Sequence, residues 1–135
     1  MVKGPIRVLM TKLAFDAHDR ALRYVSAKLR DAGMEVIISR FHLVEEVVNT
    51  AIQEAVDVIG VSIYTGGQIV VAQDLMELLK ARSATDIKVV FGGTIPTDDV
   101  QRLKDLGVHD VFPPGTPPEV FTASIERLVR GEVSV

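Results

Sequence analysis

Cysteine is absent from the 135-residue sequence, and its absence removes several kinds of chemistry at once. Disulfides, thiolate metal sites and cysteine nucleophiles are all excluded, and the lack of cysteine suits a cytoplasmic protein. No apolar run approaches the ~20 residues that a membrane-spanning helix needs, and residues 1–5 show no signal-peptide pattern. The sequence therefore predicts a cytoplasmic protein with no membrane partner.

Strong positive charge is also lacking. The 15 Lys and Arg residues against 18 Asp and Glu residues give a net charge of −3, and no basic tract interrupts the mixture. Nonspecific electrostatic binding to nucleic acid needs a basic surface, so no nucleic-acid partner is expected. The P-loop, the GxGxxG dinucleotide signature, the HExxH zinc motif and the GxSxG hydrolase motif are missing as well.

The chain does contain a regular alternation of two patterns. Five short runs rich in Val and Ile fit strands buried on both faces of a parallel sheet, namely residues 6–10, 35–38, 57–61, 88–91 and 108–112. The segments after them carry apolar residues at three- and four-residue spacing, which is typical of amphipathic helices. This (βα)5 pattern predicts a single domain over residues 1–135, an α/β fold with a doubly wound, flavodoxin-like parallel sheet of strand order 2-1-3-4-5.

That strand order places a ligand site at the carboxyl ends of the strands, where the winding reverses between the first and third strands. The loop after the first strand, residues 11–21, is long and gathers Lys12, Asp16, His18, Asp19 and Arg20. The carboxylate of Asp16 can accept the Nδ1–H of His18, which leaves Nε2 free as a ligand or base, and Lys12 could pair with Asp16. The alternative is a plain helix cap by Asp16 or Asp19, with His18 solvated.

Three further loops bring small and polar residues to the same edge of the sheet. Residues 62–67 follow the third strand, Gly92 and Gly93 follow the fourth, and residues 113–118 follow the fifth. Ser62 can offer a hydroxyl group to a ligand, and glycines permit close approach of a ligand or special dihedral angles. Taken singly, each loop also fits an ordinary strand end or turn, with Thr116 as a helix N-cap.

Taken together, the four loops resemble the cobalamin-binding domain of the methylmalonyl-CoA mutase family, over nearly the whole chain. The Asp-x-His-x-x-Gly motif of that family is similar to residues 16–21, and Lys12 matches its preceding lysine. The Ser-x-Leu motif falls on residues 62–64, the Gly-Gly pair on residues 92–93, and the Phe-Gly-Pro-Gly-Thr stretch on residues 112–116. The motifs in this order are far more specific than any one of them.

The resemblance implies the cobalamin-binding small subunit of an adenosylcobalamin-dependent acyl-CoA mutase. His18 would be the axial cobalt ligand of a cofactor bound base-off and histidine-on, steadied by Asp16 and Lys12. The cofactor carries the radical chemistry, no catalytic residue is expected in this chain, and a separate large subunit binds the acyl-CoA. The cofactor-binding residues that the resemblance implies are Lys12, Asp16, Ala17, His18, Asp19, Arg20, Ala21, Ser62, Ile63, Tyr64, Gly66, Gly92, Gly93, Phe112, Gly115 and Thr116.

Three positions depart from the family pattern. Ala21 replaces the motif glycine, Ala17 replaces a frequent glycine, and Tyr64 replaces the leucine of Ser-x-Leu. The added atoms intrude on the slot for the nucleotide tail of the cofactor, and overpacking of this kind can cost roughly 1–3 kcal/mol. A non-catalytic corrinoid carrier or sensor, or a diverged module with weakened cobalamin binding, therefore stays open. An unrelated flavodoxin-like interaction domain is the third alternative.

Overall fold

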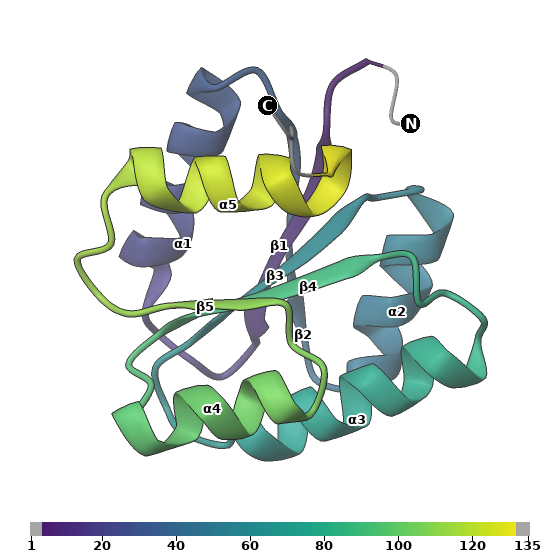
Figure 1. Ribbon diagram of the computed structural model, residues 1–135. Coiled ribbons are helices and arrows are strands. Elements are labelled where there is room, and N and C mark those ends of the chain that lie inside the picture. Colours follow the sequence, from purple (N-terminus) through teal and green to yellow (C-terminus); the bar gives the residue numbers. More distant parts are fainter. Residues whose placement is uncertain (1–3, 132–135) are drawn as a thin grey trace.

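The computed structural model describes residues 4–131, in which strands and helices alternate along the chain (Figure 1). The elements are β1 (Arg7–Leu13), α1 (Asp19–Asp31), β2 (Glu35–Phe41), α2 (Val44–Gln53), β3 (Val58–Ile63), α3 (Gln68–Ala81), β4 (Lys88–Gly93), α4 (Thr97–Asp105), β5 (Asp110–Phe112) and α5 (Pro118–Arg130). The strands form one parallel sheet in the order β2-β1-β3-β4-β5. The predicted (βα)5 flavodoxin-like sheet is confirmed. The predicted domain extent, residues 1–135, reaches beyond the described residues and stays a prediction.

Helices cover both faces of the sheet (Figure 1). The helices α1 and α5 lie together on one face, and α2, α3 and α4 follow one another on the other. The strand β3 is buried at every position, and its successive side chains point to opposite faces. Val58 therefore packs in the apolar cluster under α1 and α5, whereas Ile59 and Val61 pack under α2 and α3.

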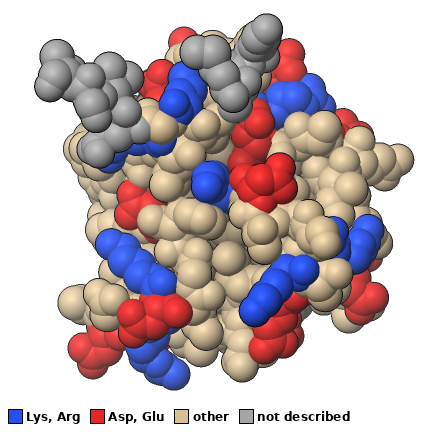
Figure 2. Space-filling view, turned by 45° about the vertical axis from the view of Figure 1, so that its right-hand side comes forward, with Lys and Arg blue, Asp and Glu red and all other residues tan. Residues whose placement is uncertain are grey.

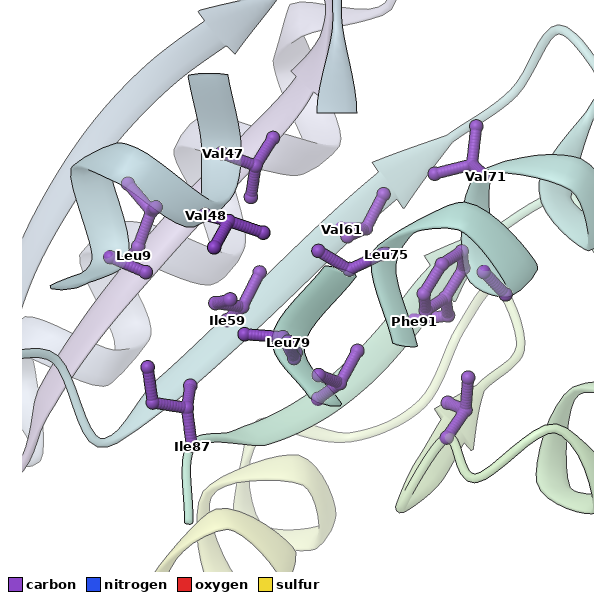
Figure 3. Close-up of a cluster of buried hydrophobic side chains, with 14 of the residues drawn as sticks. Leu9, Val47, Val48, Ile59, Val61, Val71, Leu75, Leu79, Ile87 and Phe91 are labelled. Carbon is purple, nitrogen blue, oxygen red and sulfur yellow. The ribbon is translucent and has the colours of Figure 1, made fainter. Parts of the chain in front are cut away.

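The larger apolar cluster lies between the sheet and the helices α2 and α3 (Figure 3). Val47 and Val48 of α2 and Leu75 and Leu79 of α3 pack around Ile59 of β3. Each of these five side chains is at most 2% exposed. Full burial of such a side chain is worth about 1.5–3 kcal/mol, so this layer is a major source of stability for the sheet.

The first four strands, β1 to β4, run further toward their carboxyl ends than the sequence patterns predicted. Lys12, Ser62 and Gly92, which were expected in loops, lie inside β1, β3 and β4. The register pairs Lys12 with Ser62, and Ser62 with Gly92. The loop prediction was wrong at these positions because the ladder joins main-chain groups, so a polar or missing side chain does not end it.

His109 lies at the start of the β4–β5 pairing, where its main chain and its ring both bond to Val89. Its main-chain N–H donates to the carbonyl of Val89 at 2.8 Å, and its ring Nδ1 accepts the N–H of Val89 at 3.0 Å. Burial and the charge of Lys88 lower the pKa of His109, against a smaller opposing effect of the Val89 hydrogen bond. The neutral ring therefore stabilises this edge of the sheet.

Charges of both signs are dispersed over the surface. Figure 2 shows Lys and Arg beside Asp and Glu around largely uncharged areas on one face of the molecule. Such a distribution agrees with the small net charge of −3. Within residues 4–131, no helix combines the length and the apolar composition that crossing a bilayer requires.

Replacing His109 with asparagine should weaken the dependence of stability on pH below about pH 6.5. The pKa of His109 is lower in the folded chain than its ordinary value of 6.5. As the pH falls, the unfolded chain therefore takes up the proton first, and the stability contributed by the neutral ring is lost below pH 6.5. Asparagine keeps an acceptor near the position of Nδ1 but does not titrate. Urea titrations at a series of pH values measure the free energy of unfolding of the wild type and of the variant. If this free energy falls equally in both proteins on acidification, the role of His109 is contradicted.

Gly93 at the end of β4 is a position where only glycine fits. Its φ is +123°, and a Cβ there would overlap the carbonyl group of Ile63. We expect Gly93→Ala to lower the free energy of unfolding by about 3 kcal/mol, because neither the dihedral angle nor the neighbouring strand can yield. Gly66→Ala is the matched control, because Gly66 has a φ of +87° but open space around it, and it should cost about 1 kcal/mol. Equal losses on chemical denaturation would show that the overlap is relieved.

Candidate functional site

The buried carboxylate of Asp16 organises the short loop between β1 and α1. Asp16 is 2% exposed. Its Oδ1 accepts the main-chain N–H of His18 at 2.9 Å and lies 2.6 Å from Nδ1 of the His18 ring, and its Oδ2 accepts the main-chain N–H of Tyr64 at 3.1 Å. Because an ionised carboxylate can only accept, Nδ1 of His18 carries a proton, and Nε2 is the ring nitrogen that points away from Asp16 and can serve as a ligand.

These hydrogen bonds also set the charge of Asp16. Burial alone would raise its pKa, but the hydrogen bonds from the main chain and ring of His18, together with that from Tyr64, lower the pKa below the ordinary 3.8. Asp16 is therefore ionised at neutral pH and remains an acceptor for the ring. The His18 side chain is 58% exposed, so the ring reaches the surface at the carboxyl edge of the sheet.

Lys12 approaches the loop from inside the sheet, but not as predicted. The lysine is 2% exposed, and its Nζ contacts the main-chain carbonyl of Asp16 and the carboxylate of Asp19. The hydrogen bond from Lys12, and then the charge of Arg40 at 3.1 Å, lower the pKa of Asp19 despite partial burial. The predicted pair between Lys12 and the carboxylate of Asp16 was wrong, because N–H groups of His18 and Tyr64 surround that carboxylate and Asp19 neutralises the lysine.

The alternative reading of Asp16 and Asp19 as simple helix caps is wrong as well. The helix α1 begins at Asp19, its N-cap residue is His18, and no side chain makes a capping hydrogen bond. Asp16 instead bonds the main chain two residues further on, which is the geometry of an Asx turn. The turn holds the His18 main chain and its ring against the same carboxylate.

The ring of Tyr64 stacks on the ring of His18. The two centroids are 5.1 Å apart and the planes are inclined by 21°. Tyr64 directly follows β3, and burial, with a smaller contribution from the charge of Asp16, raises its pKa above the ordinary 10.0. The phenol is therefore neutral at physiological pH. Asp16, His18 and Tyr64 form one unit, called the histidine cluster below.

A cavity of about 390 Å³ opens beside the histidine cluster, between the sheet and the helices α1 and α5. Its floor is made by the strand residues that face these helices, which are Met10, Gly60, Ser62, Val90 and Gly92. Two of the five are glycines, so the floor lies close to the main chain of the sheet. The last residue of β5, Phe112, and the residues that follow it, 113–118, close one side. Both the location at the carboxyl edge and the mainly apolar lining are those of a small-molecule site.

Comparison with known families decides what kind of domain this is. A family model described as the B12 binding domain matches residues 6–120. The chain belongs to the B12-binding domain family. The match covers β1 to the start of α5 and therefore includes the histidine cluster and most of the cavity lining.

Known proteins resemble this B12-binding domain over almost its full length. It is 48% identical over 130 residues to the 2-hydroxyisobutanoyl-CoA mutase small subunit of Aquincola tertiaricarbonis, a match that covers 96% of each chain. It is 41% identical to the pivalyl-CoA mutase small subunit of Xanthobacter autotrophicus, over 92% of this chain and 84% of that one. A crystal structure of a cobalamin-binding protein from Desulfitobacterium hafniense, 19% identical, shares the fold with a TM-score of 0.77 over 93% of this chain and 60% of that one.

Most of the sequence-predicted site residues of this B12-binding domain meet at the carboxyl edge of the sheet. One group surrounds the His18 ring and its loop: Lys12, Asp16, His18 and Asp19. A second group lines the cavity: Ala21, Ser62, Tyr64, Gly92, Gly93, Phe112, Gly115 and Thr116. Ala17, Arg20, Ile63 and Gly66 lie outside the cavity lining. The loops that are far apart in the sequence therefore do come together as the sequence predicted.

Two expectations at the cavity need correction. Ile63 was expected to line the slot, but it is fully buried in the cluster under α2 and α3, because it points to the opposite face from Ser62. Thr116 was expected to cap the last helix. Its hydroxyl instead donates to the carbonyl of Pro113 at 2.6 Å, and α5 begins at Pro118 with Pro117 as N-cap.

Sequence reasoning missed the deeper part of the cavity. Met10, Gly60 and Val90 on the floor, and Tyr24 and Phe121 on the two helices, were not among the predicted residues. The two-residue periodicity of strands could have identified Gly60 and Val90 from the sequence. Residues two apart on a strand share a face, so Gly60 follows from Ser62 and Val90 follows from Gly92 once the strands are known to continue.

The departures from the family pattern fall in different places. Ala21 and Tyr64 both line the cavity, whereas Ala17 is exposed in the loop. The cavity remains open beside Ala21 and Tyr64, with Ser62 and the two floor glycines accessible from it. The two substitutions therefore shape the slot and do not fill it.

Proposed function

We propose that this B12-binding domain is the small subunit of an adenosylcobalamin-dependent acyl-CoA mutase, which acts in the cytoplasm with a separate large subunit that binds the acyl-CoA. The observation that carries the proposal is the His18 ring, held by Asp16 beside a deep cavity at the carboxyl edge of the sheet. The two small-subunit relatives, matched over 96% and 84% of their own lengths, support it.

The residues present fit a cobalamin bound base-off and histidine-on. His18 would supply Nε2 as the axial cobalt ligand, since Asp16 occupies Nδ1. The cavity would take the nucleotide tail, and its volume of about 390 Å³ lies within the usual range for small-molecule sites, about 300–1,000 Å³. Ser62 on the floor would offer its hydroxyl to the buried base.

In this mechanism the chain binds and orients, and the bound cofactor supplies radical chemistry by homolysis of its cobalt–carbon bond. Asp16 holds Nδ1 of His18 in a hydrogen bond, so Nε2 is the ring nitrogen left to act as the ligand. Lys12 holds the main chain at Asp16 and pairs with Asp19, which anchors the loop that carries the ring. The rearrangement of the acyl carbon skeleton takes place in the site of the large subunit, so none of the groups of this chain is assigned a catalytic role.

A non-catalytic corrinoid carrier or sensor, or a diverged module with weakened cobalamin binding, is the second candidate. It is based on Ala21 and Tyr64, which line the cavity and are larger or more polar than the glycine and leucine of the family pattern. Co-expression with a large mutase subunit separates the two, because only the mutase subunit restores turnover of an acyl-CoA. Corrinoid binding without turnover would favour the carrier.

The reduced Co(II) form of cobalamin bound to this chain should carry a histidine nitrogen as axial ligand. Chain labelled with ¹⁵N in its histidine rings should show a two-line axial nitrogen splitting in the electron paramagnetic resonance spectrum, in place of the three lines given by ¹⁴N. His18→Ala should abolish the splitting from the label, because Nε2 of His18 is the proposed ligand. His42→Ala, which changes another exposed histidine, is the matched control. Retention of the labelled splitting in His18→Ala would refute His18 as the ligand.

Filling the cavity from its floor should weaken binding of cobalamin but not of cobinamide, the corrinoid that lacks the nucleotide tail. A Cβ at Gly92 meets only the carbonyl oxygen of Phe112, at 3.5 Å, so Gly92→Val should fold and place its methyl groups in the cavity. We expect the Kd for cobalamin to rise about tenfold or more, the cost of overpacking a slot. Calorimetry measures both corrinoids, with Thr94→Val outside the cavity as control. Equal weakening for both corrinoids would contradict the tail assignment.

A further inference from the structure

Tyr64 contacts both parts of the site. Its ring stacks on His18 with centroids 5.1 Å apart, its main-chain N–H donates to Asp16 at 3.1 Å, and its side chain also lines the cavity. It is the residue of the histidine cluster that belongs to the cavity lining as well. The tyrosine therefore lies between the proposed axial ligand and the proposed slot for the tail.

The hydrogen bond to Asp16 by itself does not fix the plane of the His18 ring. A hydrogen bond at Nδ1 restrains one atom of the ring, and coupled rotation about the Cα–Cβ and Cβ–Cγ bonds can still tilt the ring plane. The side chain is 58% exposed, so packing against the protein restricts this rotation only in part. A flat ring stacked on the imidazole opposes the rotation, because turning would separate the two faces. The direction in which Nε2 points is then defined.

A single carboxylate, that of Asp16, fixes the positions of the two rings relative to each other. Oδ1 of Asp16 holds the imidazole, and Oδ2 holds the main chain that carries the phenol ring. The rest of the Tyr64 main chain is fixed because it follows directly from β3, whose last residue is fully buried. The stack is therefore built on a rigid strand end, whereas His18 lies on a loop.

We propose that Tyr64 is a positioning residue for His18, which fixes the imidazole plane by stacking and couples it to occupation of the cavity. The first part concerns the chain without cofactor, and the second rests on the proposed function. An aliphatic side chain at this position would line the slot but has no flat face for the imidazole. A phenylalanine would keep the stacking, since the contact is made by the ring and not by the hydroxyl.

The first test measures the motion of the His18 ring in the chain without cofactor. Nuclear magnetic relaxation of a ¹³C-labelled His18 ring reports its order parameter. Tyr64→Leu should lower this order parameter and remove the ring-current shift of the His18 protons, whereas Tyr64→Phe should restore both. Tyr24→Leu is the matched control, because Tyr24 also lines the cavity but belongs to α1 and has no stacking contact with His18. An unchanged order parameter in Tyr64→Leu would overturn the positioning role.

The second test measures axial ligation at equal corrinoid occupancy. At saturation with Co(II) cobalamin, the fraction of bound cobalt with the labelled histidine splitting should fall at least twofold in Tyr64→Leu and remain at the wild-type value in Tyr64→Phe. With cobinamide, which leaves the cavity empty of a tail, the difference between wild type and Tyr64→Leu should be smaller. Equal fractions in wild type and Tyr64→Leu, or an equal difference with both corrinoids, would overturn the coupling.

The two proposals fail in different ways. If the wild-type chain shows no histidine splitting, His18 ligation in the proposed function is refuted, and the ring-motion measurement alone decides the role of Tyr64. If the wild type shows the splitting and Tyr64→Leu matches it in both tests, the proposed function survives and the role of Tyr64 is refuted. Thermal unfolding of each variant identifies loss of fold, and a purely structural role would change the unfolding temperature without rescue of the ligation signal by phenylalanine.

Discussion

The buried carboxylate of Asp16 accepts hydrogen bonds from the main chain and ring of His18 and from the main chain of Tyr64, so it ties the β1–α1 loop to the end of β3. These two segments are 48 residues apart in the chain. Burial of a carboxylate is costly unless its oxygens are bonded, and here both oxygens have N–H donors. The same bonds that compensate its burial therefore fix the tautomer of His18 and the place of Tyr64.

The two faces of the sheet serve different purposes. The face under α2 and α3 is filled with large side chains such as Ile59, Leu75 and Phe91, which are almost completely buried (Figure 3). The face under α1 and α5 carries Gly60 in the middle of β3 and Gly92 near the end of β4, and the cavity lies there. Dense packing on one side stabilises the strands, and a gap on the other side can therefore persist.

Lys12 shows how a charged residue can be part of the sheet core and of the site at once. An unpaired ammonium group at 2% exposure would be strongly unfavourable. The carbonyl of Asp16 and the carboxylate of Asp19 both contact its Nζ, and Arg40 shares that carboxylate. The lysine thus anchors the β1–α1 loop from the side of the sheet, whereas the His18 ring of the histidine cluster lies on the solvent-exposed side of that loop.

The sequence by itself determined the strand order, the edge of the sheet that carries the site, the Asp16–His18 pair and the family. Periodicity, loop composition and ordered motifs are local properties of the chain, so they are readable without coordinates. Only the tertiary structure decided that Lys12 pairs with Asp19, that Ile63 faces away from the slot, that Tyr64 stacks on His18 and that Gly60 and Val90 form the cavity floor. These facts depend on where each strand ends and on which face each side chain points to. A shift of one residue in a strand reverses every such assignment, and only the packed sheet fixes it.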